Sequence, residues 1–116
     1  DPAVLEAVVA AFADLHRRSA GVRALGGDRP DTDPETRAHK RRMAELVVRL
    51  LRAHGLLHGP PPERAMLVAR TVFATADALM HEAFREDPDG DPRLLAELNR
   101  VLAGYLAGVG ADENAW

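Results

Sequence analysis

The side chains best suited to chemistry in this sequence are its five histidines. Three of them, His16, His39 and His54, fall on the apolar faces of segments with helical periodicity. Ligand pockets are mostly apolar and contain a few polar groups that orient the bound molecule, so these imidazoles are candidates for that role. The alternative is that each lies at the edge of the core and bonds to the backbone or to water.

A metal site would need several ligands converging on one ion at about 2 Å. His54 and His58 are four residues apart, the spacing of neighbours on one helix face. Gly55 lies between them, however, and is expected to end the helix. We therefore predict no metal ion, and nothing in the sequence indicates another cofactor.

Asp77 and His81 are also four residues apart, with Arg70 on the same side of the predicted helix. Such a pair could form a polar contact at a subunit interface. It could equally be an exposed pair on one helix, which contributes only a few tenths of a kcal/mol.

The only cluster of basic residues is formed by Arg37, Lys40, Arg41 and Arg42. It could contact a phosphate or another anion. The alternative is a solvated helix face, with Asp33 and Glu35 offsetting the unfavourable placement of cations near a helix N-terminus.

Enzyme chemistry has little support in this composition. The chain has no cysteine, its one serine is Ser19, and no glycine-rich phosphate loop is present. The acidic residues fall in turns or on polar faces, and none pairs with a second group as a general acid and base. We predict that the protein is not an enzyme and has no catalytic residue.

The periodicity of apolar residues predicts four long helices, and Asp-Pro pairs precede three of them. Such a pattern without strand signals is typical of an all-α helical bundle. We expect a further turn at 22–25 and a loop at 26–32. The predicted helices are Pro2–Arg18, Asp33–His54, Pro62–Arg85, and a last helix from Pro92 that ends at Gly108 and Gly110, before an acidic tail at 111–116.

The overall composition limits the possible environments and partners. With 116 residues the chain is long enough for one domain with a true core. Its formal net charge of -3 argues against a surface that coats nucleic acid. The lack of cysteine, of a signal peptide and of a long apolar run indicates a cytoplasmic protein without a membrane partner.

The predicted helix Pro62–Arg85 has two different faces. At about 100° per residue, one arc collects bulky side chains such as Val72, Phe73 and Met80. The opposite arc holds small or weakly polar residues such as Thr71 and Ala74. We expect the first arc to pack on the core of its own subunit and the second to pack on a partner helix.

The succession of helices and turns resembles the C-terminal effector-binding domain of the tetracycline-repressor (TetR) family of bacterial transcription regulators. The resemblance spans nearly the whole chain and consists of helix lengths and turn chemistry. The segments that carry it are Ala20-Gly21-Val22-Arg23-Ala24-Leu25 after the first helix, Pro34-Glu35-Thr36-Arg37 leading into 43–51, Pro62-Glu63-Arg64-Ala65, and 84–92 followed by Leu94-Leu95-Ala96-Glu97-Leu98.

This resemblance implies a bundle of four main helices that dimerises through its last two. Residues 1–110 would form the effector-binding and dimerisation domain of a transcription regulator, expected to be a repressor. The family's N-terminal helix-turn-helix has no counterpart in the sequence, so operator DNA would be bound only by a part absent from this chain. The implied partners are a second copy of the chain and a small hydrophobic or amphipathic effector. The alternative is a standalone helical interaction module with a filled core and no ligand.

We expect the large side chains on the inner faces to form the effector pocket, and the last two helices to form the dimer interface. The predicted ligand-binding residues are Phe12, Leu15, His16, His39, Met43, Val47, Leu50, Met66, Phe73 and Met80. The predicted interface residues are Leu67, Thr71, Ala74, Ala78, His81, Leu95, Leu98, Leu102 and Tyr105.

Overall fold

The computed structural model describes residues 2–18 and 34–113, and within these ranges it contains four α-helices and no strand. The helices are α1 (Pro2–Arg18), α3 (Pro34–Ala53), α4 (Pro62–Phe84) and α5 (Pro92–Glu113). The prediction of an all-α bundle of four main helices is therefore confirmed. The predicted turn at 22–25, the loop at 26–32, Ser19 and the end of the tail at 114–116 lie outside the described residues.

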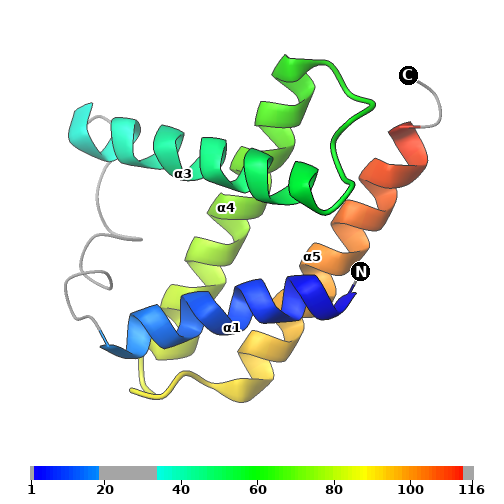
Figure 1. The fold of residues 1–116 in the computed structure, drawn as a ribbon. Helices are drawn as coiled ribbons and strands as arrows, with labels where there is room; N and C mark the ends of the chain where they lie inside the picture. The colour runs from blue at the N-terminus through cyan, green and yellow to red at the C-terminus, as the bar shows by residue number, and fades with distance from the viewer. Residues whose placement is uncertain (1, 19–33, 114–116) are drawn as a thin grey trace.

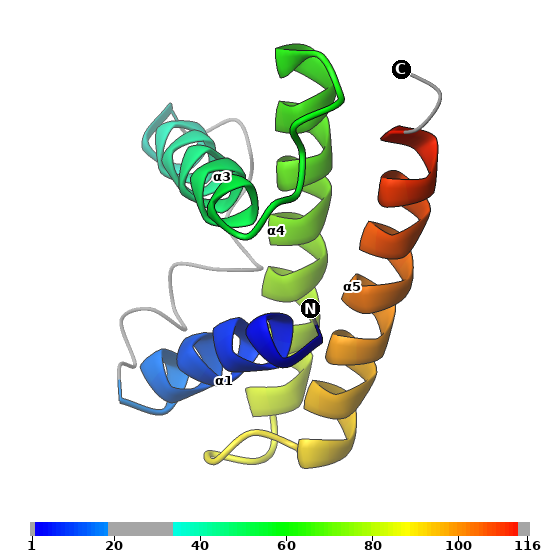
Figure 2. The same ribbon diagram turned by 45° about the vertical axis from the view of Figure 1, so that its right-hand side comes forward.

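Helices α4 and α5 form an antiparallel hairpin, and α1 and α3 both cross the same face of it (Figure 1). Figure 2 shows that the opposite face of the hairpin carries no other helix among those described. Helix α3 packs chiefly against α4, whereas α1 packs chiefly against α5. Helices α1 and α3 therefore flank a shared space instead of packing closely on each other.

The core follows the predicted division of α4 into two faces. Val68 and Ala69 on this helix are fully buried, as is Leu98 on α5. The outer arc of small residues, which includes Thr71 and Ala74, is exposed. None of the helices in the described ranges is long and apolar enough to cross a membrane.

Helix α3 ends at a glycine turn, as predicted. Gly55 has a φ of 83°, and the Leu56 amide donates to the Leu51 carbonyl at 2.9 Å. This is a Schellman ending, in which a residue with positive φ lets the chain reverse. The next residue, Leu57, also has a positive φ of 60° although it is not glycine, and its side chain is almost completely buried. The Arg52 side chain donates to the Leu57 carbonyl at 3.2 Å, which ties the connection to α3.

The turn between α4 and α5 is organised by acidic residues. The Asp89 amide donates to the Asp87 carboxylate at 2.9 Å, and the Arg93 amide donates to Asp91 at 2.9 Å, so that Asp91 caps α5. The hydrogen bond from the Arg93 side chain holds the pKa of Asp91 below its ordinary value. The turn is also linked to α1, because the Arg17 side chain donates to the Asp89 carbonyl at 2.7 Å.

Gly90 in this turn has a φ of 84°, and a Cβ added there would lie 2.8 Å from the Phe84 ring. We expect Gly90→Ala to lower the free energy of unfolding by about 2–4 kcal/mol, because backbone strain and a steric clash combine. Gly55→Ala is the matched control: its φ of 83° is almost the same, but no atom lies within 4 Å of the added Cβ. Urea denaturation of both variants measures the difference, and equal losses would exclude a contribution from the clash.

The predicted end of the last helix is wrong. Helix α5 continues through Gly108 and Gly110 to Glu113, so the first residues of the expected tail are helical. Both glycines lie inside a helix that packs on the core through its buried residues Leu106 and Val109. This packing outweighs the cost of about 1 kcal/mol that each glycine adds to a helix interior.

Candidate functional site

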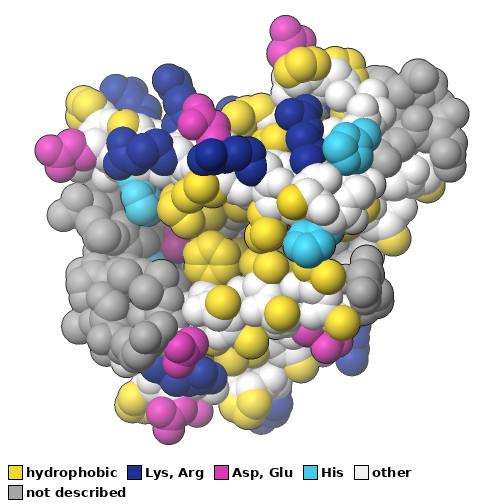
Figure 3. All heavy atoms as spheres, in the orientation of Figure 1, with side chains coloured by type: hydrophobic (Ala, Val, Ile, Leu, Met, Phe, Trp, Pro, Cys, Tyr) yellow, Lys and Arg dark blue, Asp and Glu magenta, His cyan; other side chains and the backbone are white. Residues whose placement is uncertain are grey.

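A cavity of about 340 Å³ lies between α1 and α3, with α4 and α5 behind it. Hydrophobic side chains gather in this region of the surface, below a row of Lys and Arg side chains over α3 (Figure 3). The described lining residues are Val4, Leu5, Val8, Val9 and Phe12 on α1; Val47, Leu50 and Leu51 near the end of α3, with His54 and Leu56 after it; Val72, Phe73, Ala76 and Met80 on α4; and Leu102, Ala103, Leu106, Ala107 and Gly110 on α5.

Helical spacing explains how four helices contribute to one cavity. Residues three or four apart share a helix face, and this is the spacing of Leu5, Val8 and Phe12 on α1. Small residues on the hairpin leave the space behind these side chains open, among them Ala76 on α4 and Ala103 on α5. The cavity therefore lies where large side chains of all four helices surround a few small residues of the hairpin.

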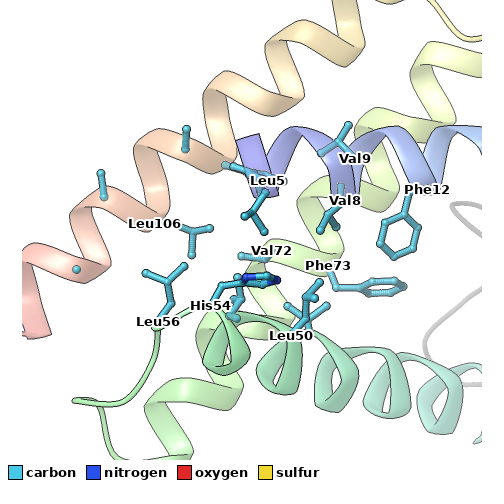
Figure 4. Close-up of a pocket in the computed structure, with 18 of the residues that line it drawn as sticks. Leu5, Val8, Val9, Phe12, Leu50, His54, Leu56, Val72, Phe73 and Leu106 are labelled. Atoms are coloured by element: carbon cyan, nitrogen blue, oxygen red, sulfur yellow. The ribbon is translucent and has the colours of Figure 1, made fainter. Parts of the chain in front are cut away.

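Among the described residues of this lining, His54 alone has a nitrogen or oxygen in its side chain. Figure 4 shows its ring among apolar side chains, with Leu56 and Leu106 toward one end of the space and Phe12 and Phe73 at the other. A neutral imidazole can donate one hydrogen bond and accept another. The described part of the lining offers no nucleophile and no pair of acid and base, and its chemistry suits the binding of an apolar molecule.

The structure brings together five of the ten residues predicted to bind a ligand. Phe12, Val47, Leu50, Phe73 and Met80 all line the cavity.

The other five predicted residues lie elsewhere or are not described. Met66 lines a separate hollow, and His39 and Met43, which are half-buried, line neither space. Leu15 and His16 belong to α1, but their side chains lie outside the described residues.

The prediction omitted the whole contribution of α5 to the cavity. It assigned the apolar face of this helix to the dimer interface, although Leu106 and Ala107 line the cavity. Periodicity identified which residues share a face but gave no sign of which neighbour that face meets. The signal available for His54 was its place on the apolar face of α3, beside Leu50 and Val47.

A second, more open hollow of about 980 Å³ lies along the first half of α3 and the outer side of α4. Its described residues include four cationic side chains and two carboxylates, an excess of two positive charges in a chain with a net charge of -3. Phe73 lines both this hollow and the apolar cavity. The charged residues are Arg37, Lys40, Arg41, Glu45, Arg70 and Asp77.

The predicted Asp77 and His81 pair is present. The His81 Nδ1 lies 3.6 Å from the Asp77 carboxylate and 3.0 Å from its carbonyl oxygen, and both side chains are about one-fifth exposed. Among the described residues, no three side chains of the types that bind metal ions converge. The imidazole of His58 contacts the backbone instead: its Nε2 lies 3.0 Å from the Arg52 carbonyl oxygen.

The predicted interface residues separate into three groups by exposure, of which the third, Leu98 and Leu102, is buried. Leu67, Thr71, Ala74 and Ala78 are exposed on the outer side of α4, and His81, Leu95 and Tyr105 are half-buried.

Leu98 and Leu102 require a correction. They are 0% and 3% exposed in the single subunit, so their side chains present no surface to a partner. On α5 the exposed residues away from the core include Val101, Gly104 and Gly108. The apolar face of α5 is thus covered within one subunit.

Comparison with protein families gave one match. The model of a family described as "Tetracyclin repressor-like, C-terminal domain" matches residues 2–106, which include all the cavity-lining residues except Ala107 and Gly110. The searches of curated proteins and of solved structures gave no match.

Proposed function

The chain belongs to the tetracyclin repressor-like C-terminal domain family, and on that premise we propose that it binds the effector of a cytoplasmic bacterial transcription regulator, expected to be a repressor, and dimerises. The effector is a small hydrophobic or amphipathic molecule, and operator DNA is bound by a separate N-terminal domain.

The observation that carries this proposal is the apolar cavity between α1 and α3. Its volume of about 340 Å³ lies at the lower end of the range for ligand pockets, roughly 300–1,000 Å³. Transfer of apolar ligand surface from water into such a space contributes about 25 cal/mol per Å². A sugar or nucleotide would lose hydrogen bonds with water that His54 alone could not replace, so we propose a mainly apolar ligand.

The position of the cavity suggests how binding would alter the protein. Its two walls, α1 and α3, pack chiefly on different helices, α5 and α4 respectively. A ligand between them would favour the arrangement in which they are held apart. A ligand that binds one arrangement of these helices more tightly than the other shifts the equilibrium between the two conformations. In a dimer, this shift would change the spacing of two DNA-binding domains.

The alternative, a standalone interaction module with a filled core, would require close packing between α1 and α3. The space between these helices favours the sensor. The matched family favours it as well, because its members are domains of transcription regulators.

We further propose that the outer face of the α4–α5 hairpin forms the dimer interface. Of the three large apolar residues with high exposure among those described, two lie on these helices, Leu67 at 49% and Val101 at 46%. Gly104 and Gly108 have no atom within 4 Å of an added Cβ, so a partner helix could approach closely there. Helix axes pack at about 8–10 Å, and small residues permit the lower part of that range. Leu67, Thr71, Ala74, Ala78 and His81 remain in the proposed interface. The first four also line the hollow beside α3, so in the proposed dimer the partner would lie along the α4 wall of that hollow.

The ligand proposal is tested by thermal unfolding with decanol as a probe and glucose as a polar control. A ligand at one hundred times its dissociation constant stabilises the folded state by about 2.7 kcal/mol. We expect decanol to raise the Tm by several degrees and glucose at the same concentration to leave it unchanged. An unchanged Tm with decanol would contradict the proposal.

A further inference from the structure

We propose that the hollow along α3 and α4 is a subsite for an anionic headgroup, a carboxylate or phosphate, of the same ligand whose apolar part occupies the cavity. This inference rests on the proposed function and specifies the chemical class of the ligand as an anionic amphiphile.

The first argument is that the two spaces adjoin each other at Phe73. Phe73 lines both, and α3 extends along both, since its last turns line the cavity and its first turns line the hollow. Arg41 and Val47 are six residues apart, which corresponds to about 9 Å along the helix axis. A molecule with its apolar chain beside Val47 therefore needs only a short extension past Phe73 to place its headgroup near Arg41.

The second argument is the charge of the hollow. Four cationic side chains face two carboxylates there, and one of these, Asp77, is 3.6 Å from His81. Arg37 and Arg41 form no ion pair with any described residue. These two guanidinium groups can therefore bind an added anion, and arginine recognises carboxylate and phosphate with paired hydrogen bonds.

The third argument is that Arg37 is placed unfavourably in the helix that carries it. Arg41 has the opposite charge of Glu45 four residues on, but no ion pair joins the two side chains. Arg37 lies in the first turn of α3, where the helix dipole disfavours positive charge. Arg37 and Arg41 are also like charges four residues apart, which destabilises a helix by a few tenths of a kcal/mol. A bound anion would remove both unfavourable terms.

His54 is the other group that could receive a polar headgroup, but it is one imidazole beside Leu50 and Leu56. It would orient a single hydrogen-bonding group, whereas the hollow supplies several positive charges. The hollow therefore fits an anion better, and the two positions are distinguished by substitution.

The experiment compares the binding of decanoate and decanol, which share a chain length and differ in the charge of the headgroup, by calorimetry at low salt. We expect the protein to bind decanoate at least about tenfold more tightly, the equivalent of one charge-assisted hydrogen bond. The double variant Arg37→Gln/Arg41→Gln should lose this preference and keep its affinity for decanol. Arg42→Gln is the matched control, because Arg42 is exposed on α3 and does not line the hollow, and it should keep the preference.

Further measurements separate the possible failures. Equal affinity for decanoate and decanol would overturn the subsite and leave the sensor intact, whereas binding of neither would overturn both. Loss of the preference in His54→Gln but not in the double arginine variant would place the headgroup at the other end of the cavity and overturn the proposal. Decyl phosphate should bind as decanoate does. A last outcome is that inorganic phosphate alone stabilises the protein and that the double arginine variant loses this effect. That result would indicate an anion site independent of the cavity and would also overturn the proposal of a shared ligand.

Discussion

Replacement of Val101 by glutamate is expected to convert the proposed dimer into monomers. This side chain is 46% exposed on α5, beside the outer face of the hairpin, and a partner helix would bury it. A carboxylate buried without a partner is costly, so the dimer dissociation constant should rise by a factor of about one hundred or more. Sedimentation velocity at micromolar concentration measures the change, and Leu67→Glu, at a position exposed to 49%, should have the same effect.

Leu46→Glu provides the matched control for these variants. Leu46 is 48% exposed, almost the same as the other two, but it lies on α3 on the opposite side of the hairpin. It should therefore leave the mass in solution unchanged. A dimer that survives Val101→Glu and Leu67→Glu, or one that Leu46→Glu disrupts, would place the interface elsewhere.

Gly104→Ala tests whether the two copies approach closely at α5. Within one subunit the added Cβ meets no atom within 4 Å, so the helix should gain about 0.5–1 kcal/mol of stability. The same methyl group would separate two closely packed helices and weaken the dimer. Unaltered or tighter association in this variant would argue against a close approach at Gly104.

Substitution of Ala76 by phenylalanine is expected to abolish effector binding while the domain remains folded. Ala76 is half-buried and lines the cavity from α4, so the new ring would occupy the space that the ligand needs. Filling a cavity commonly preserves or raises stability, so the Tm without ligand should not fall. The increase in Tm caused by decanol should disappear.

Ala96→Phe supplies the control for the cavity variant. Ala96 is an exposed helical residue of α5 that lines neither space, and the same change there should leave the decanol effect intact. If Ala76→Phe responded to decanol as the unsubstituted protein does, the ligand would bind outside the cavity.

The fold was largely predictable because the residues that begin and end its helices act through local interactions. Asp91 and Pro92 begin α5 where the capping rule requires it, and Gly55 ends α3 with a positive φ. The end of α5 was not predictable in the same way. Gly108 and Gly110 are helix-breaking by intrinsic preference, and only the packing of neighbours such as Leu106 and Val109 on the core keeps them helical.

The cavity could be predicted only in part, for a related reason. Periodicity collects Val47 and Leu50 on one face of α3, and both line the cavity. It cannot specify whether an apolar face meets the subunit's own core or a second copy. Leu98 and Leu102 were assigned to the interface and are buried within the subunit, which depends on how α1 crosses α5.

The hydrogen-bonded connection after α3 anchors one end of this helix and not the other. Its carboxyl end is fixed by the buried Leu57 and by the bond from Arg52. In the proposed conformational change, residues 54–58 would therefore act as the pivot. A helix of 20 residues is about 30 Å long, so a rotation of about 5° at that pivot would move the first turn of α3 by about 2.6 Å. A ligand bound near this pivot would thus need to cause only a small rotation of α3. The amino end of the helix would then move much farther, and a neighbouring domain could respond to that displacement.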